Sequence, residues 1–210
     1  MRVLVACEYS GAVRDAFRAR GHDAMSCDLL PTDVPGPHYQ GDVFDVIGDG
    51  WDLMIAHPPC TYLSSSGLHW NGRVEGRAAK TEDALAFVRA LLDAPISRIA
   101  VENPVGCIGT RIRKADQTIQ PHQFGDDASK ATCLWLKGLP LLTPTAHVPG
   151  RDVNGRLRWA NQTDSGQNRL APSADRWKLR SATFPGIAAA MADQWGDPDA
   201  ALPLLKRLAA

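Results

Sequence analysis

The first 28 residues of the chain carry the pattern that most constrains its fold. The run over residues 2–6 is apolar after Arg2, which is typical of a central, buried strand. Gly11 then precedes a helical pattern over Ala12–Arg20, and a second short strand follows over His22–Cys27. A strand, a helix and a strand in such close succession form a βαβ unit, so we expect the two strands to lie parallel in one sheet.

The rest of the chain continues this alternation of strands and helices. Further strands are predicted at the start of Asp52–Cys60, over residues 98–102 and over residues 131–137. Further helices are predicted over residues 80–93 and 185–195, and loops over residues 31–41 and 61–72, of which the second is expected to be mobile. We therefore expect an α/β fold with a Rossmann-like, doubly wound, mostly parallel sheet, in a single domain over residues 1–210.

The composition is that of an ordinary soluble protein, with 44% hydrophobic and 22% charged residues and a formal net charge of zero. Any contact with nucleic acid must therefore come from local basic patches rather than from the overall charge. The five cysteines include no CxxC pair, which argues against a disulfide framework or a zinc site and favours a reducing compartment. The N-terminal apolar run is too short for a signal peptide, and no apolar stretch approaches the ~20 residues of a membrane span. We expect a cytoplasmic protein without a bound metal, and the pattern predicts no particular oligomeric state.

Two predicted strands are stopped by prolines and carry a reactive group at the stop. The run Asp52–Cys60 ends in His57-Pro-Pro-Cys60, and the strand over residues 98–102 ends in Glu102-Asn103-Pro104. Open α/β sheets bind ligands at the carboxyl ends of their strands. A thiol and a carboxylate in that place are a candidate nucleophile and a candidate proton donor for one reaction.

The order of these motifs resembles the DNA cytosine-5 methyltransferase family, in the short form carried by phages and prophages. The resemblance covers residue 3 to about residue 137 and, more loosely, residues 181–195. It implies the fold of S-adenosylmethionine-dependent methyltransferases and S-adenosyl-L-methionine as the cofactor. The implied cofactor contacts lie at strand ends and before the last helix: Cys7, Glu8, Tyr9, Ser10, Gly11, Asp28, Asp42, Pro58, Ser181 and Thr183. Among them the resemblance assigns Asp28 to the ribose hydroxyls and Asp42 to the adenine amino group, whereas only Gly11 remains of the glycines usual in the first turn.

The resemblance also implies a division of catalytic roles. Cys60 would attack carbon 6 of cytosine, because carbon 5 becomes nucleophilic only after such an addition. Glu102 would assist at ring nitrogen 3, for which we expect its pKa to be raised in a poorly solvated pocket. Asn103 would hold the loop that carries Cys60. Lys130 stands where the family has the arginine that contacts the base, and it lacks the planar fork of a guanidinium.

DNA, with the target cytosine flipped out of the stack, is the expected partner. Residues 143–181 form a short basic insert where full-length relatives carry a large target-recognition domain. This insert and the segment Ser64–Lys80, expected to be a mobile basic loop, supply the candidate DNA contacts: Ser64, His69, Trp70, Arg73, Arg77, Arg156, Arg158, Trp159, Arg169, Trp177 and Arg180. Arginines bind phosphates and indoles stack on bases, and a closing loop would cover a flipped base.

Three other functions remain open. His57-Pro58-Pro59 also resembles the Asp-Pro-Pro-aromatic motif of exocyclic amino methyltransferases, which act on N4 of cytosine or N6 of adenine. The small size of the insert also suits a methyltransferase that acts on a free cytosine nucleotide. A non-catalytic DNA-binding protein could keep the same fold, with Cys60 as a buried structural thiol.

Overall fold

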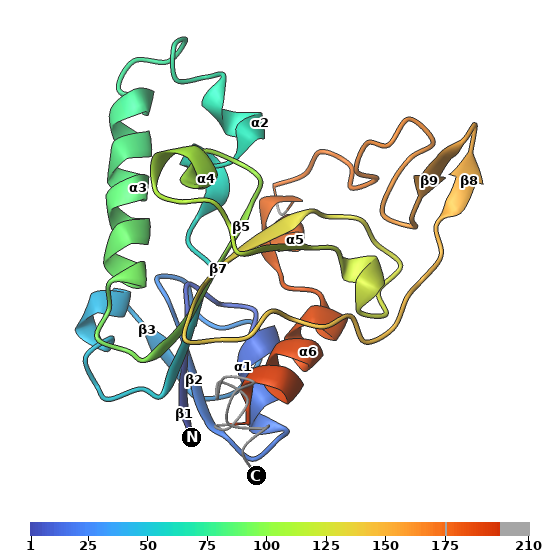
Figure 1. The fold of residues 1–210 in the computed structure, drawn as a ribbon. Coiled ribbons are helices and arrows are strands. Elements are labelled where there is room, and N and C mark those ends of the chain that lie inside the picture. Colours follow the sequence, from blue (N-terminus) through green and yellow to red (C-terminus); the bar gives the residue numbers. More distant parts are fainter. Residues whose placement is uncertain (175, 198–210) are drawn as a thin grey trace.

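A seven-stranded sheet forms the centre of the computed structural model, which describes residues 1–174 and 176–197 (Figure 1). Its order is β3-β2-β1-β4-β5-β7-β6. The strands are β1 (Arg2–Ala6), β2 (Asp23–Asp28), β3 (His38–Gln40), β4 (Leu53–Ala56), β5 (Arg98–Pro104), β6 (Gln117–Ile119) and β7 (Thr132–Lys137). Neighbours from β3 to β5 pair in parallel, and β7 is antiparallel to both β5 and β6. The predicted Rossmann-like, doubly wound, mostly parallel sheet is confirmed.

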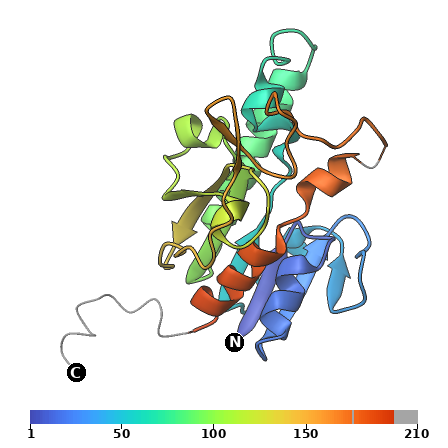
Figure 2. The same cartoon turned by 90° about the vertical axis from the view of Figure 1, so that its right-hand side faces the viewer.

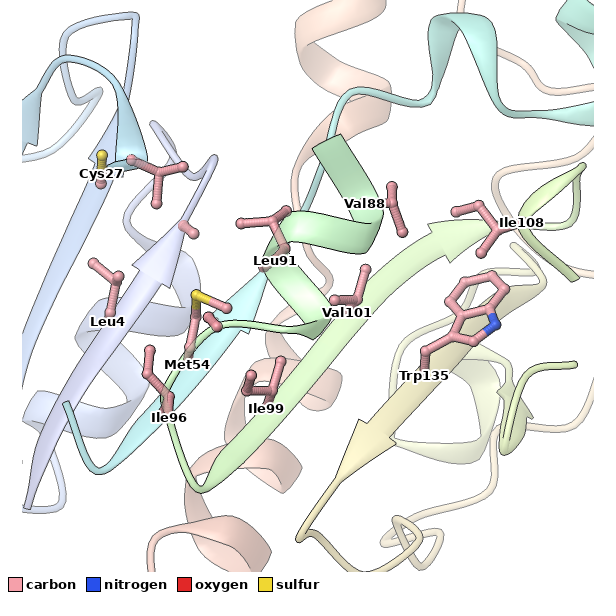
Figure 3. Close-up of a cluster of buried hydrophobic side chains, with 14 of the residues drawn as sticks. Leu4, Cys27, Met54, Val88, Leu91, Ile96, Ile99, Val101, Ile108 and Trp135 are labelled. Atoms are coloured by element: carbon pink, nitrogen blue, oxygen red, sulfur yellow. The ribbon is translucent and has the colours of Figure 1, made fainter. Parts of the chain in front are cut away.

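Alternate residues of the central strands enter two separate hydrophobic cores, as the period of two in a strand requires. Leu4 of β1 belongs to the core beneath helix α3 (Arg77–Leu92), which also contains Met54, Val101 and Trp135 (Figure 3). Val3 and Val5 belong to the opposite core, beneath α1 (Ala12–Arg18) and α6 (Pro185–Trp195). The sheet is thus the middle layer of three, with helices covering both faces.

The topology reverses direction between β1 and β4. From β1 the chain runs outward through β2 to β3, then crosses back to β4 on the other side of β1. Connections that leave two neighbouring parallel strands in opposite directions open a crevice at the carboxyl ends of those strands. The fold therefore places the segments that follow β1 and β4 on either side of one crevice.

Several local predictions differ from the structure. The segment Ser64–Lys80 is not a simple loop, because it contains α2 (Ser65–Leu68) and the first turn of α3, and a short 3-10 helix (Cys60–Tyr62) precedes it. The predicted loop over residues 31–41 contains β3, which pairs with β2 from Ser26↔His38 onward. The sequence gives no signal for β3 or β6, because each strand has only three residues and no apolar run. Both lie at the edges of the sheet.

Smaller elements complete the described chain: the 3-10 helices Val43–Asp45 and Pro121–Gln123, and the helices α4 (Ile108–Arg111) and α5 (Arg176–Ser181). The basic insert forms a hairpin of β8 (Arg151–Val153) and β9 (Arg156–Arg158), which stands out from the sheet, whereas α5 lies nearer the sheet's centre (Figures 1 and 2). Asn154 and Gly155 both have positive φ, as a tight hairpin turn requires. No described helix has both the length and the apolar character needed to cross a membrane.

A buried arginine fastens α1 to the loop that follows β2. The Arg14 side chain is fully buried, and it pairs with Asp15 at 2.8 Å. Its Nη1 donates to the hydroxyls of Ser26 and Thr32, and its Nη2 donates to the carbonyls of Val34 and Pro35. Gly11 and Gly36 lie against the guanidinium, where a Cβ would overlap it. The glycine of the first turn is therefore required by Arg14 and by its own φ of 74°.

We expect Arg14→Met to destabilise the protein by about 3 kcal/mol, because it removes one partner from a buried, charged hydrogen-bond network. Urea unfolding followed by circular dichroism would measure the change. Arg18→Met on the same helix is the control, since Arg18 is exposed and its replacement should change stability by less than about 0.5 kcal/mol. Equal stabilities of the two variants would contradict the role of Arg14.

Candidate active site

A cavity lies in the crevice that the topology predicts. It has a volume of about 430 Å³ and is bounded by the carboxyl ends of β1, β2 and β4 and by one side of α3. Its walls include four of the residues expected to contact the cofactor: Cys7, Asp28, Asp42 and Pro58. Much of the remaining wall is apolar and includes Leu29, Leu63 and Phe87. Such a cavity suits a ligand with one flat apolar part and a few polar groups.

Asp28 and Asp42 each present a carboxylate to this cavity with one oxygen already engaged. Asp28 Oδ1 accepts from the backbone N–H of Leu30 at 2.9 Å, and Asp42 Oδ1 accepts from that of Phe44 at 3.0 Å. Burial raises the pKa of Asp28, although the N–H of Leu30 partly opposes this rise. Each carboxylate keeps acceptor capacity for a ligand hydroxyl or amino group.

A second, smaller cavity of about 40 Å³ shares Cys7 with the first. It is lined by Cys7, Glu8, Tyr9, Ser10, His57, Ser181, Ala182 and Thr183. The structure thus brings the end of α5 and the residues after it next to the end of β1. This is the position that the predicted cofactor contacts of Ser181 and Thr183 need. Tyr9 fastens this closure, because its hydroxyl donates to the carbonyl of Lys178 at 2.9 Å and lies 2.6 Å from Ser181 Oγ.

Two residues of the turn between β1 and α1 have a structural role or an unusual conformation. Glu8 is buried, and its carboxylate accepts from the backbone N–H groups of Val13 and Arg14 at 2.7 and 3.2 Å, so it caps the start of α1. Cys7 has a φ of 58°, a left-handed conformation that is uncommon for a residue with a side chain. This strained backbone lies at the junction of the two cavities.

Cys60 is the first residue of a 3-10 helix and is exposed, whereas Cys27, Cys107 and Cys133 are buried and Cys7 is partly buried. Two contacts hold the loop that carries it. Asn103 Nδ2 donates to the carbonyl of Pro58 at 2.7 Å, which is the contact expected of the residue predicted to hold this loop. Gly106 packs so closely on the carbonyl of Leu63 that a Cβ would overlap it. Both contacts come from β5 or from the residues that follow it.

Glu102 forms a close pair with a residue that the sequence patterns did not single out. Its Oε2 lies 3.1 Å from His57 Nδ1, and the two side chains are only 12% and 9% exposed. Burial acts to raise the pKa of Glu102, but the hydrogen bonds from His57 and Thr132 and the charge of Lys130 together lower it. The expectation of a raised pKa is therefore wrong for this arrangement. The only sequence signal for His57 was its place before the two prolines.

Lys130 lies at the same centre. Its Nζ donates to the carbonyl of Arg180 at 3.0 Å, which joins the segment before β7 to the last residues of α5. Although Cys60 is exposed as a residue, its thiol is partly desolvated by the groups around it, which raises the pKa of the thiol. The positive charge of Lys130 opposes this rise in pKa, and the charge of Glu102 adds to it. The structure thus brings Cys60, Glu102 and Lys130 into electrostatic reach of one another.

The candidate DNA contacts of the segment Ser64–Lys80 differ in their exposure to solvent. His69, Trp70 and Arg73 are exposed, with the two rings 4.9 Å apart and the Arg73 guanidinium 5.8 Å from the indole. Arg77 is partly buried, because it donates to the carbonyl of Thr61 at 2.9 Å and lies over the ring of Tyr62. Ser64 is buried and is therefore not part of the exposed surface that DNA could contact.

Several basic and aromatic side chains of the insert are already in contact with other groups of this chain. Arg158 donates to the carbonyl of Asp164 at 3.1 Å, and Arg169 donates to that of Gln162 at 2.7 Å. The Trp159 ring stacks on His122, with the centroids 4.1 Å apart. The remaining candidates of the insert are exposed: Arg156, Trp177 and Arg180.

The chain was compared with protein families, curated proteins and solved structures. No protein-family model matches it, and none of the curated proteins matches it. One solved structure with a related fold is described as a candidate DNA modification methyltransferase encoded within a prophage of E. coli, and it is 14% identical with a TM-score of 0.48. The match covers 74% of this chain and 53% of that protein, so it spans about half of that protein's length.

Within the described ranges, no cluster of three or more histidine, cysteine or acidic side chains is arranged to hold a metal ion.

We expect Cys60 to be the cysteine of the native protein that reacts fastest with iodoacetamide. Because the thiolate is the reactive form and the pKa is raised, the rate should still be rising as the pH passes 9. Lys130→Ala should slow alkylation at pH 8 severalfold, since it removes a charge that stabilises the thiolate. Peptide mass spectrometry would assign the modified residue, and the exposed Lys114→Ala would serve as the control. A rate independent of Lys130 would contradict this electrostatic picture.

Proposed function

We propose that the protein transfers a methyl group from S-adenosyl-L-methionine to carbon 5 of cytosine in DNA. One observation carries the proposal: an exposed thiol, a buried carboxylate and an ammonium group meet beside a cavity whose polar groups include two aspartates. Each of these groups comes from a different strand end or loop, as a site assembled for chemistry requires.

The cavities support S-adenosyl-L-methionine as the cofactor. The larger one has room for a nucleoside, with Asp28 and Asp42 as acceptors for ribose hydroxyls and an amino group and with Phe87 and Leu29 as apolar neighbours of the base. The smaller one would take the amino-acid end, beyond Cys7. When bound, this cofactor supplies an electrophilic methyl group.

The chain's own groups would then activate the cytosine. The Cys60 thiolate adds to carbon 6, which makes carbon 5 nucleophilic towards the methyl group. Glu102 offsets the negative charge that develops at ring nitrogen 3 by donating a proton there. After methylation, loss of the carbon 5 proton to a base, return of the nitrogen 3 proton to Glu102 and departure of the thiolate restore the aromatic ring. Asn103 keeps Cys60 in place through the carbonyl of Pro58.

The lowered pKa of Glu102 adds a condition to this scheme. Before the base enters, the carboxylate is ionised at neutral pH and is suited to accept from the exocyclic amino group of cytosine. Its service as a proton donor then requires protonation when the base is bound. The negative charge that develops at ring nitrogen 3 would favour this, because a nearby like charge raises the pKa of a carboxyl group. Glu102 would thus recognise the base first and donate the proton afterwards.

The proposal also includes a DNA-contacting surface made of exposed basic and aromatic side chains. His69, Trp70 and Arg73 on and after α2 would meet the duplex or a displaced base, with Arg156, Trp177 and Arg180 of the insert as further candidates. Arg158 and Arg169 would contribute less, because their guanidinium groups bind carbonyls of the insert.

We expect a covalent adduct when the protein is incubated with S-adenosyl-L-methionine and a duplex that contains 5-fluorocytosine. Fluorine at carbon 5 cannot leave as a proton does, so the thioether between Cys60 and carbon 6 persists. Denaturing gel electrophoresis would detect it, and Cys60→Ala should abolish it.

Exposed His147→Asn, outside the site, is the matched control and should still form the adduct. Nucleoside mass spectrometry of unmodified DNA would show where the methyl group goes. Methylation on an exocyclic nitrogen, or methylation by Cys60→Ala, would reject the proposal. Modification of a free cytosine nucleotide but not of DNA would reject the substrate part alone.

We expect Asp28→Asn to weaken the binding of S-adenosylhomocysteine by about tenfold or more, because a hydrogen bond to a charged acceptor is replaced by one to a neutral amide. Isothermal titration calorimetry would measure the dissociation constant. Asp49→Asn, at an exposed position outside the cavities, should leave it unchanged. Equal affinities of the two variants would contradict the role of Asp28.

A further inference from the structure

One buried polar atom beside the smaller cavity has no use in the scheme so far. His57 Nδ1 is engaged by Glu102, but His57 Nε2 is buried without a hydrogen-bond partner among the described residues. His57 also lines the smaller cavity, together with Ser10 and Thr183. An unpaired nitrogen in such a place costs free energy unless a ligand satisfies it.

We propose that His57 is a positioning residue that links the cofactor to Glu102. Its Nδ1–H holds the Glu102 carboxylate, and its Nε2 accepts a hydrogen bond from the α-amino group of the cofactor. The inference rests on the proposed function, since the donor is identified from the chemistry of S-adenosyl-L-methionine.

The hydrogen bond to Glu102 fixes where the ring carries its first proton. An ionised carboxylate can only accept, so this bond places a proton on His57 Nδ1. The tautomer that belongs to the proposal is the neutral imidazole with this proton, in which Nε2 is an acceptor. No described residue donates to Nε2, and the Tyr9 hydroxyl in the same cavity is already engaged by Lys178 and Ser181. A ligand in this cavity can supply the missing donor.

The position of the cavity selects which donor of the cofactor reaches Nε2. The ribose hydroxyls and the adenine amino group belong near Asp28 and Asp42, in the larger cavity. The end of the ligand that extends past Cys7 is the amino acid, and its only donor is the α-amino group. The backbone N–H of His57 also bonds the carbonyl of Ala6 at 2.9 Å, which fixes the ring's origin beside β1.

A link of this kind makes the two sites interdependent. A donor on Nε2 fixes the tautomer and the orientation of the ring, and through Nδ1 it fixes the Glu102 carboxylate. Cofactor binding would therefore prepare the group that meets the cytosine. By thermodynamic reciprocity, an occupied base site would tighten cofactor binding by the same factor.

The test pairs two substitutions at His57 with two ligands. In His57→Asn the amide nitrogen stands near the place of Nδ1, and nothing reaches the place of Nε2. In His57→Gln the longer amide reaches the place of Nε2 and leaves Glu102 without its donor. The ligands are S-adenosylhomocysteine and its analogue in which hydrogen replaces the α-amino group, with dissociation constants from calorimetry.

We expect the wild type to prefer S-adenosylhomocysteine over the analogue by about tenfold or more. His57→Asn should lose this preference, whereas His57→Gln should keep most of it and instead slow adduct formation with 5-fluorocytosine DNA by about tenfold or more. The control His147→Asn, an exposed histidine outside both cavities, should behave as the wild type does in both measurements.

Three outcomes overturn the inference. The wild type could bind both ligands equally, His57→Asn could retain the preference, or both variants could lose affinity and adduct rate in the same proportion, as a structural role would give. Failure of the wild type to bind S-adenosylhomocysteine would instead refute the proposed function, and this inference with it. Ligand binding without any adduct would refute the cytosine chemistry while the ligand comparison still decides the role of Nε2.

Discussion

The register between β4 and β5 is the constraint on which the site depends. Ala56 pairs with Val101 in parallel strands, so the next residues on each strand, His57 and Glu102, emerge side by side and on the same face. One residue further, Asn103 reaches the carbonyl of Pro58 and fixes the turn that presents Cys60. A slip of one residue would turn Glu102 to the other face and break both contacts. The apolar alternation that fills two cores therefore also holds the geometry of the candidate site.

The sequence predicted the parts of this arrangement that depend on local pattern. Proline-stopped apolar runs marked the ends of β4 and β5, and so the places of Cys60 and Glu102, while the glycine before α1 marked the first turn. The lowered pKa of Glu102 could not be predicted in this way, because it results from His57, Lys130 and Thr132, which are distant from Glu102 in the sequence. The edge strands β3 and β6 were missed for another reason, since each has only three residues and no apolar run.

The arginines of the insert show the same limit for a binding surface. A count of basic residues treats Arg156, Arg158 and Arg169 alike as candidates for phosphate contact. In the folded chain, Arg158 and Arg169 bind carbonyls of the insert, which is too short to form a hydrophobic core of its own. Trp159 likewise packs on His122 and anchors the hairpin to the segment after β6. Some charged side chains of a small insert thus stabilise the insert itself, and only the others are available to a partner.

The two reactive groups of the proposed mechanism make opposite demands on their surroundings. Cys60 must lose a proton to act, and Glu102 must hold one. The positive charge of Lys130 lowers the pKa of both groups, so in the resting protein it favours the nucleophile at the expense of the acid. This conflict is resolved if the cytosine itself completes the site. When Cys60 adds to the base, the negative charge that develops at ring nitrogen 3 would raise the pKa of Glu102 beside it, whereas Lys130 supports the thiolate before the addition. The acid would then become competent only when its substrate is present.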